Sequence, residues 1–369
     1  MFHTAAGFIK KNAVAVIAFA AAAITSLIVP PDAAYINYFD FKTLSCLLCV
    51  LAVVCALRRL RFFYALAHGV VRLFGNMRAC SLAVVYVTFI GSMLIANDMA
   101  LLTFLPLGYN VLKACRMEKY TSKLFILQTI AANLGGMLTP FGNPQNLYLY
   151  GKFNIPESEF ISVMAPPFLV SMLLFTVCCV LFFKPEPLNV PEEKIPLPKM
   201  KTARLLVLFA VSIIMVFRVI PYYLGLAAVV IALLFIDKSA FADVDWALLL
   251  TFVFFFIFAG NMSRMGAVRD IFSSLLAKNT LLMSAASCQV ISNVPSAILL
   301  SQFTSNYREL LVGVNVGGTG TLIASLASLI TFREYVRHEP SGGVKYLLEY
   351  SAFSFAFLAI LLAFESVIL

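Results

Sequence analysis

The sequence predicts an all-α polytopic membrane protein with two inverted-topology repeats, and three observations support this fold class. The chain of 369 residues is 62% apolar and 12% charged, whereas a soluble domain carries about 25% charged residues. Apolar runs of roughly 18 residues or more recur from end to end, and this length crosses a bilayer as a helix. Polar, glycine-rich interruptions fall at corresponding places in the two halves of the chain.

We expect about nine full spans and two re-entrant hairpins that enter and leave the bilayer on the same side. The full spans are predicted over 12–29, 43–57, 122–150, 160–183, 205–219, 222–236, 246–261, 309–332 and 346–366. The spans over 122–150 and 309–332 are interrupted. The hairpins over 79–115 and 280–306 each carry a polar break near the middle.

The first apolar run resembles a signal peptide, but further spans follow it, and we expect it to remain as an uncleaved helix. Two basic, amphipathic segments, 60–76 and 263–278, are expected to lie along the membrane interface. The net charge of +9 comes from Lys and Arg in short loops between spans. With a cytoplasmic N-terminus, about 20 of the 27 basic residues lie on the cytoplasmic side. We therefore expect a multi-pass protein of the inner (plasma) membrane, in contact with lipid and not with nucleic acid.

Cysteine and histidine give no sign of a catalytic or metal centre. Cys46 and Cys49 have a C-x-x-C spacing, but they fall within a span and have no second pair. We interpret them as small buried hydrophobic residues rather than as a redox or metal site. The three histidines form no ligand cluster, and the spans hold no nucleophile–base pair. The sequence thus predicts neither an enzyme nor a bound cofactor.

The two halves of the chain repeat one order of motifs. A polar, proline-rich segment over 185–204 is interpreted as a cytoplasmic linker between a first repeat, 1–184, and a second half, 205–369. One extra span precedes the second repeat, so that this repeat enters the membrane from the opposite side. The matched pairs are Asn97 with Asn293, Gly135-Gly136 with Gly317-Gly318, Thr139 with Thr321, Asn143 with Ser325, and Asn146 with Ser328. Inverted repeats with interrupted helices are typical of secondary transporters.

The interruptions predict backbone that leaves the helix inside the membrane. Unpaired backbone groups in hydrocarbon cost several kcal/mol each, so such a break persists only where it faces protein, water or a ligand. Asn143 before Pro144 reads as an N-cap followed by the first residue of a new half-helix. Pro295 soon after Asn293 indicates a similar start. Free N–H groups at such starts bind anions, while freed carbonyls and amide oxygens bind Na⁺. The alternative is that these glycines and prolines only kink packed helices.

Asp98 is the single residue that most strongly suggests a functional site, because a charge at the bilayer centre costs at least about 2.5–3.5 kcal/mol. The matching residue of the second half is Val294. One reading makes Asp98 a ligand for a cation or proton. The other makes its carboxylate a cap for the half-helix that begins there. The two readings are compatible, and the sequence leaves both open.

The stretches "ANDMALLTFLPL", "TPFGNPQN", "SNVPSAILL" and "VGVNVGGTGTLIASLASL" resemble the ion transporter superfamily. This group includes divalent anion/sodium symporters, citrate permeases, arsenite permeases and D-type sodium/proton antiporters. The nearest resemblance is to its arsenite-permease-like branch, often labelled anion permease or citrate transporter-like. It implies a homodimer with a fixed scaffold and an elevator-like transport domain.

In the dicarboxylate and sulphate branch of that superfamily, a Ser-Asn-Thr motif in each half binds the anion and Na⁺. This chain keeps both asparagines, but it lacks the threonine in both halves and the serine in the first, which disfavours a dicarboxylate. By position, the resemblance implies a substrate site at Asn97, Thr139, Asn143, Ser292, Asn293, Thr319 and Thr321. It implies a cation site, for Na⁺ in particular, at Asn97, Asp98, Gly142, Asn143, Asn293 and Gly318.

The function predicted from these observations is symport of a small inorganic or carboxylate anion, driven by Na⁺ or H⁺ as the coupling ion. Two alternatives stay open. A Na⁺/H⁺ antiporter is favoured by Asp98, although such exchangers generally need more than one membrane carboxylate. An arsenite or antimonite efflux permease is the other. An ion channel would not need an inverted repeat.

Overall fold

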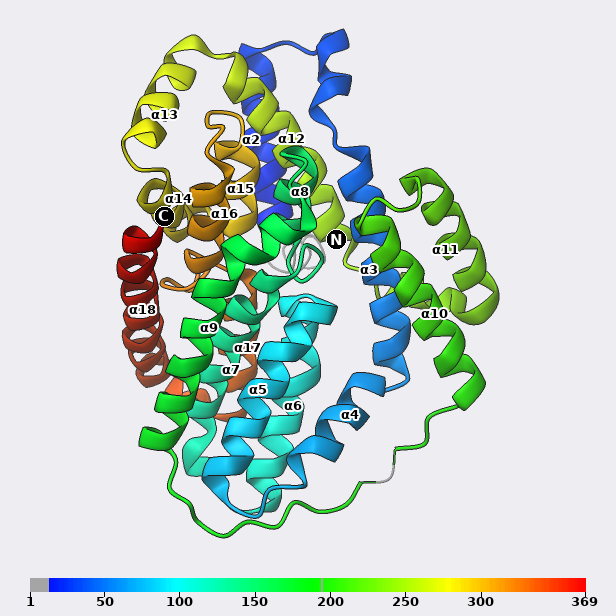
Figure 1. Cartoon of the computed structure of the whole chain (residues 1–369), viewed down its shortest axis with the longest axis vertical. Helices are drawn as coiled ribbons and strands as arrows, with labels where there is room; N and C mark the ends of the chain where they lie inside the picture. The colour runs from blue at the N-terminus through cyan, green and yellow to red at the C-terminus, as the bar shows by residue number, and fades with distance from the viewer. Residues whose placement is uncertain (1–12, 194) are drawn as a thin grey trace, which may run out of the picture.

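The computed structural model describes residues 13–193 and 195–369 (Figure 1). These residues form helices and no β-strand. The helices before the linker are α2 (Ala13–Ile28), α3 (Phe41–Arg59), α4 (Phe62–Val71), α5 (Met77–Ile95), α6 (Asn97–Ala114), α7 (Thr121–Gly135), α8 (Pro144–Lys152) and α9 (Glu157–Phe182). The helices after it are α10 (Lys199–Val216), α11 (Tyr222–Asp237), α12 (Trp246–Arg264), α13 (Gly266–Lys278), α14 (Thr280–Ile291), α15 (Asn293–Leu300), α16 (Tyr307–Val316), α17 (Leu326–His338) and α18 (Gly343–Ile368).

Six helical segments are long and apolar enough to cross a membrane, so the prediction of a polytopic helical protein is confirmed. They are Phe41–Arg59, Met77–Ile95, Glu157–Phe182, Tyr222–Ala242, Trp246–Arg264 and Pro340–Ile368. The expected nine full spans are not all of this kind. The two interrupted spans are each divided into short helices, α10 carries three basic residues, and α2 has 16 described residues. The predicted first residue of the first span, at position 12, falls within residues 1–12, outside the described part.

Both predicted interruptions are present. The first span is divided into α7, a short 3-10 segment (Gly136–Leu138) and α8. The second is divided into α16 and α17, with no regular helix between Val316 and Leu326. Of the two expected explanations, simple kinking is therefore wrong: the backbone leaves the helix for several residues. Glycine accounts for this in both interruptions, because it adopts non-helical backbone at low cost. In the first interruption proline contributes as well, because it supplies no N–H.

The segments predicted as hairpins consist of helix pairs that pack against each other, α5 with α6 and α14 with α15. Their arms differ in length: α5 has 19 residues, whereas α14 has 12 and α15 has 8. At about 1.5 Å per residue, α5 is close to the thickness of a bilayer core, so its length alone does not mark it as a half-depth arm. Re-entry and the inverted topology of the repeats remain predictions.

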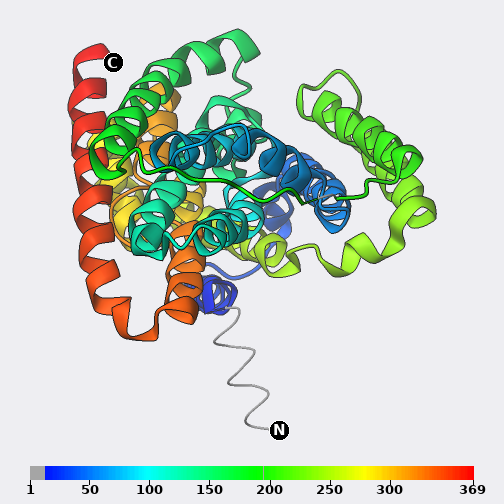
Figure 2. The ribbon, with the colours of Figure 1, turned by 90° about the horizontal axis from the view of Figure 1, so that it is seen from below.

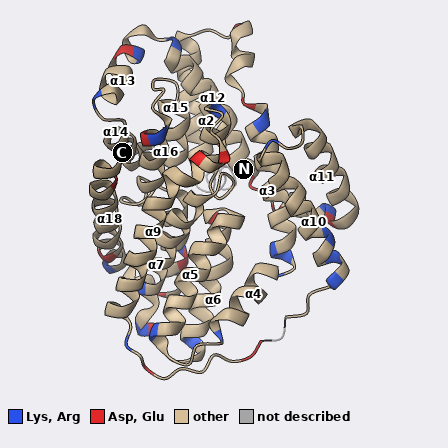
Figure 3. Cartoon of the chain, in the orientation of Figure 1, with Lys and Arg blue, Asp and Glu red and all other residues tan. Residues whose placement is uncertain are grey.

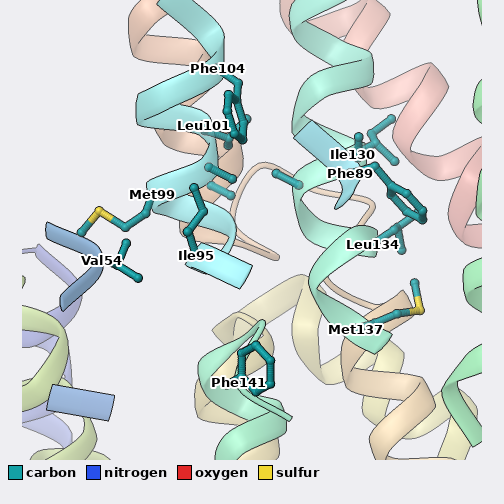
Figure 4. Packing of buried hydrophobic residues seen from close by; sticks show 14 of the residues in the cluster. Val54, Phe89, Ile95, Met99, Leu101, Phe104, Ile130, Leu134, Met137 and Phe141 are labelled. Atoms are coloured by element: carbon teal, nitrogen blue, oxygen red, sulfur yellow. The ribbon is translucent and has the colours of Figure 1, made fainter. Parts of the chain in front are cut away.

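The hydrophobic core includes the hairpin helices and the broken spans and extends into α3, α9, α12 and α18. Phe89 of α5 lies beside Ile130 and Leu134 of α7 (Figure 4). Close packing depends on Gly135, since an alanine Cβ there would collide with the carbonyl oxygen of Phe89. The free thiols of Cys46 and Cys49 are buried in α3, which agrees with their interpretation as small core residues.

Helices α10 and α11 pack against α3 and lie on the side of the molecule opposite α18 (Figures 1 and 2). The linker crosses the lower face from α9 to α10 (Figure 2), and its described residues on either side of 194 form no helix. It is shorter than predicted, because α10 already begins at Lys199. Its glutamates hold it in place: Glu193 pairs with Arg61 at 2.7 Å and Glu192 with Arg72 at 2.9 Å.

Candidate functional site

Four helix starts surround one small cavity at the centre of the fold. Its walls come from the first turns of α6, α8, α15 and α17, completed by side chains of α2 and α12. The lining residues are Val14, Asn97, Asp98, Pro144, Gln145, Leu248, Thr251, Ser292, Asn293, Val294, Pro295, Ser325 and Leu326. The backbone N–H groups of a helix start carry partial positive charge. A cavity bordered by four such starts therefore favours an anion.

The two helix-pair tips have the same backbone geometry. Ala96, between α5 and α6, has φ +61° and ψ 152°, and Ser292, between α14 and α15, has φ +75° and ψ 160°. The next residue acts alike in both: the Oδ1 of Asn97 accepts from the N–H of Asp98 at 3.0 Å, and that of Asn293 accepts from the N–H of Val294 at 2.9 Å. Asn97 and Asn293, which the sequence predicts to be equivalent, thus share one local structure, and both line the cavity.

Asn133 links the first broken span to the second. Its Oδ1 accepts hydrogen bonds from the Oγ of Ser325 at 2.7 Å and from the Nδ2 of Asn97 at 3.0 Å. Its own Nδ2 donates to the carbonyl of Gly318 at 3.4 Å. One buried amide therefore ties α7 to the tip before α6 and to the interruption before α17.

Asn315 makes the reciprocal link from α16. Its Oδ1 accepts from the Nδ2 of Asn143 at 3.4 Å and from the Nε2 of Gln145 at 3.2 Å, and its Nδ2 donates to the Oδ1 of Asn146 at 2.6 Å. Asn133 and Asn315 each stand two residues before a Gly-Gly pair. Each half of the chain thus reaches into the interruption of the other with an asparagine from the same position.

The threonines predicted by matching positions also behave alike, but they face backbone and not the cavity. The Oγ1 of Thr139 donates to the carbonyl of Met93 at 2.7 Å, and that of Thr321 donates to the carbonyl of Gln289 at 3.2 Å. Met93 and Gln289 both stand three residues before a tip residue. These hydroxyls fasten each tip to its own broken span.

Several other predicted residues lie outside the cavity wall. Thr319 is fully buried, and its Oγ1 donates to the carbonyl of Val316 at 2.6 Å. Gly142 and Gly318 pack against polar groups of the interruptions: a Cβ on Gly142 would meet the Oγ1 of Thr139 at 2.7 Å, and one on Gly318 would meet the Nδ2 of Asn293 at 3.1 Å. The structure therefore brings Asn97, Asp98, Ser292 and Asn293 together in the wall, and it keeps the remaining predicted residues behind them.

Asn143 begins α8, and Pro144 is the first helical residue, as predicted. The predicted side-chain cap is wrong, however. The Nδ2 of Asn143 donates to the carbonyl of Asn133 at 3.3 Å and to Asn315, while its buried Oδ1 has no hydrogen-bond partner among the described residues. The contact with Asn133 and Asn315 replaces the cap, which leaves the N–H groups at the start of α8 free of a side-chain acceptor.

Asp98 lies in the first turn of α6, but it makes no capping bond. Its Oδ1 is buried and has no hydrogen-bond partner within residues 13–193 and 195–369. The capping interpretation is therefore not supported by the structure. An unpaired carboxylate oxygen at the cavity wall is instead available to a bound cation or proton.

The sequence reasoning missed Asn133, Asn315 and Gln289. A signal for the first two was present, because the pattern N-x-G-G occurs in both halves as "NLGG" and "NVGG". Gln289 gave no paired signal, since the first half has Met93 in its place. The Gln289 side chain accepts from the N–H of Thr321 at 2.8 Å and donates to the carbonyls of Gly317 at 2.9 Å and Thr319 at 3.0 Å.

Sequence comparisons give this arrangement a family. A profile of citrate transporters matches residues 4–307, a range that includes α2 to α15. The chain belongs to the citrate transporter family. It is also similar to an uncharacterized transporter of Methanocaldococcus jannaschii, with 33% identity over 297 residues, which cover 80% of this chain and 81% of the relative. An inner membrane protein of Escherichia coli is 30% identical over 282 residues, 74% of each chain.

Membership of the citrate transporter family confirms the predicted kinship with anion permeases. The protein is a membrane transporter rather than an enzyme. The matched range contains both tips and the first interruption, but it ends before the second interruption between α16 and α17. The pairing of Asn133 with Ser325 therefore reaches beyond the part that the family profile covers.

Proposed function

We propose that this member of the citrate transporter family is a secondary active transporter of a small inorganic or carboxylate anion, coupled to Na⁺ or H⁺. The observation that carries the proposal is the convergence of four helix starts on one cavity. Aligned peptide dipoles and free N–H groups at such starts stabilise negative charge without a bound metal. No Lys, Arg or His lines the cavity, so the peptide N–H groups and amide side chains would supply the anion's partners.

A coupling cation would be held by oxygen ligands of the same wall and of Asn143 behind it. The unpartnered Oδ1 atoms of Asp98 and Asn143 and the Oε1 of Gln145 are buried acceptors, and Na⁺ takes carboxylate, amide and carbonyl oxygens. A cation beside Asp98 would also cancel the repulsion between its carboxylate and an incoming anion. This supports an order in which the cation, Na⁺ or H⁺, binds before the anion.

The size of the cavity supports transport by alternating access. Its volume of about 30 Å³ corresponds to roughly two or three waters, at ~10–15 Å³ each by this measure. An anion with several carboxylates needs the walls to separate, so this shape represents a closed state in the proposed cycle. In the proposed cycle the walls separate between α2 and α12 on one side and the tips and broken spans on the other.

An elevator-like movement would carry the tips and broken spans as one unit. α7 packs against α5, α16 packs against α14, and α17 contacts both α6 and α7. The Asn133 and Asn315 bonds join these pairs across the two repeats. In this proposal α3, α10 and α11 belong to the fixed scaffold, and two copies of the chain form a homodimer. The protein would reside in the inner (plasma) membrane, the location named for the Escherichia coli relative, and its N-terminus would be cytoplasmic.

Uptake by purified protein in proteoliposomes tests this function. Candidate anions, including citrate, phosphate and sulphate, are supplied with an inward Na⁺ gradient, an inward H⁺ gradient or neither. We expect accumulation of at least one anion above its equilibrium level only when a gradient is present. Uptake of every accepted anion that is indifferent to both gradients would contradict coupling, and single-channel conductance would indicate a pore.

A Na⁺/H⁺ antiporter is the alternative that a specific observation favours, namely the unpaired oxygen of Asp98. In that case a Na⁺ gradient would drive proton movement without any anion substrate. A pH-sensitive dye trapped inside the same proteoliposomes distinguishes the two functions. Dye response without added anion favours exchange, and a response that needs the anion favours symport.

A further inference from the structure

An open hollow lies between the start of α10 and the end of α11, far from the central cavity in the fold. Its volume is about 520 Å³, and its lining includes Lys199, Lys201, Arg204, Met200 and Phe235. Figure 3 shows the basic residues along the lower part of α10. Both helices pack on α3, so the hollow stands on the outer side of the helices proposed as scaffold.

The basic residues of the hollow are only partly neutralised. Lys201 pairs with Asp237 at 2.7 Å, and Asp237 also accepts from Ser239. Lys199 and Arg204 have no ion-pair partner among residues 13–193 and 195–369. The first turn of α10 contains no acidic residue and has no side-chain cap, so the positive end of this helix adds to two uncompensated cations.

Both helices also contribute exposed apolar side chains to the hollow. Phe235 of α11 is 87% exposed, and Met200 of α10 is 69% exposed. Further exposed apolar side chains, Ile231 on α11 and Val207 on α10, continue along the two helices toward their middle. A small soluble anion would make no favourable contact with these apolar side chains. A phospholipid would use both parts of the hollow, because its phosphate binds cations and its acyl chains pack against apolar side chains.

We infer that this hollow binds the headgroup of an anionic phospholipid. The phosphate accepts hydrogen bonds from the Lys199 ammonium and the Arg204 guanidinium, and an acyl chain lies along Phe235. Basic pockets at the end of membrane helices recognise anionic headgroups in this way. The site needs only that the chain spans a membrane, and it is independent of what the central cavity transports.

The test uses full-length protein in nanodiscs of phosphatidylcholine with increasing fractions of phosphatidylglycerol. Thermal unfolding measures stabilisation by the lipid, and native mass spectrometry counts the phosphatidylglycerol retained in detergent. We compare Lys199→Gln/Arg204→Gln with Arg337→Gln/Lys345→Gln. The control also removes one arginine charge and one lysine charge, but from side chains outside the hollow that are 76% and 80% exposed. We expect the apparent affinity for phosphatidylglycerol to fall about fivefold for each charge removed from the hollow, and less than twofold in the control.

Three results would overturn the inference. An equal loss in both double variants would mean diffuse attraction between basic residues and the membrane. Equal stabilisation by inorganic phosphate in detergent would mean an ion site without a lipid. If Phe235→Ala retained as much phosphatidylglycerol as the unchanged protein, the acyl chain would not contact Phe235. Should the first double variant lack a cooperative unfolding transition, the single variants Lys199→Gln and Arg204→Gln replace it, each with a fivefold expectation.

Discussion

The hydroxyl of Ser325 donates a hydrogen bond of 2.7 Å to the Oδ1 of Asn133, across 192 positions of sequence. This bond joins the interruption of the second broken span to the helix before the interruption of the first. The equivalent residues, Asn143 and Asn315, form the mirror contact at 3.4 Å. The two interruptions therefore stabilise each other, in addition to the bonds that each makes within its own half, and this helps to explain how unwound backbone is tolerated in the interior of a membrane protein.

Ser325→Ala should lower stability and transport together. It removes the donor to Asn133 and the weak cap at the N–H of Ala327. Interhelical polar contacts in membrane proteins contribute ~0.6 kcal/mol to stability on average and reach ~1.7 kcal/mol. We therefore expect the free energy of unfolding to fall by an amount within that range. Thermal unfolding in detergent and uptake in proteoliposomes check this. Ser162→Ala is the matched control, because the Ser162 hydroxyl is exposed and bonds only within its own helix. A loss no larger than in Ser162→Ala would exclude a joining role for Ser325.

Asn315→Ala should lower the free energy of unfolding at least as much as Asn133→Ala does. Asn315 supports three side chains of the first interruption, Asn143, Gln145 and Asn146. Its removal leaves buried amides without partners, at about 1–3 kcal/mol for each unsatisfied group. Stability of the two single variants and of the double variant gives a coupling energy. If the two interruptions support each other, the double variant loses less than the sum; strict additivity would show that the halves are independent.

The breaks were predictable because glycine, proline and a following asparagine disrupt helix periodicity in a recognisable order. The partners of the breaks were less predictable. Asn133 stands within a helical run, and its spacing does not tell which interruption it faces. The family resemblance placed Thr319 at the cavity by position, but irregular backbone has no fixed period, and the Thr319 hydroxyl donates to the carbonyl of Val316 instead. The sequence thus predicts where the helix stops, while packing decides which polar side chains fill the gap.

Gln289→Met tests an asymmetry between the halves, since the equivalent residue of the first half is Met93. The substitution leaves the N–H of Thr321 and the carbonyls of Gly317 and Thr319 without their partner. We expect lower thermal stability, by about 1–3 kcal/mol for a buried group left unsatisfied, and reduced uptake. Met93→Leu is the control, because a volume-conserving change in the core usually costs less than ~1.5 kcal/mol. If Gln289→Met and Met93→Leu had the same thermal stability and uptake, water would have to replace the hydrogen bonds of the Gln289 amide.

Asp98→Asn should separate coupling from folding. The change keeps the shape of the side chain and removes a charge whose Oδ1 is buried without a partner, so we expect stability to stay or rise. Under the proposed symport, uptake loses its response to the cation gradient while anion binding persists. Asp270→Asn is the control, because Asp270 is exposed on α13. Uptake by Asp98→Asn that remains fully gradient-driven would assign the coupling ion to other oxygens.

Gly135→Ala and Gly317→Ala should both destabilise the protein, because each glycine lets a broken span approach its hairpin helix. An added Cβ at Gly135 collides with the carbonyl oxygen of Phe89, and one at Gly317 lies 2.8 Å from the Cα of Ala285. Phe89 and Ala285 stand at matching distances before the two tips, so the repeats share this contact. Backbone has little freedom to yield, and overpacking of this kind costs about 1–3 kcal/mol.

Gly69→Ala is the control for these two substitutions, since nothing lies within 4 Å of a Cβ at that position of α4. In a helix, alanine is more favourable than glycine by roughly 0.5–1 kcal/mol, so Gly69→Ala should raise the melting temperature while the other two lower it. If the same Gly→Ala change raises the melting temperature at Gly69 and lowers it at Gly135 and Gly317, the loss comes from the close helix contacts at those two positions. It then does not come from the replacement of glycine as such. If Gly135→Ala and Gly317→Ala raised the melting temperature as well, the close approach of α7 to α5 and of α16 to α14 would not exist in the membrane.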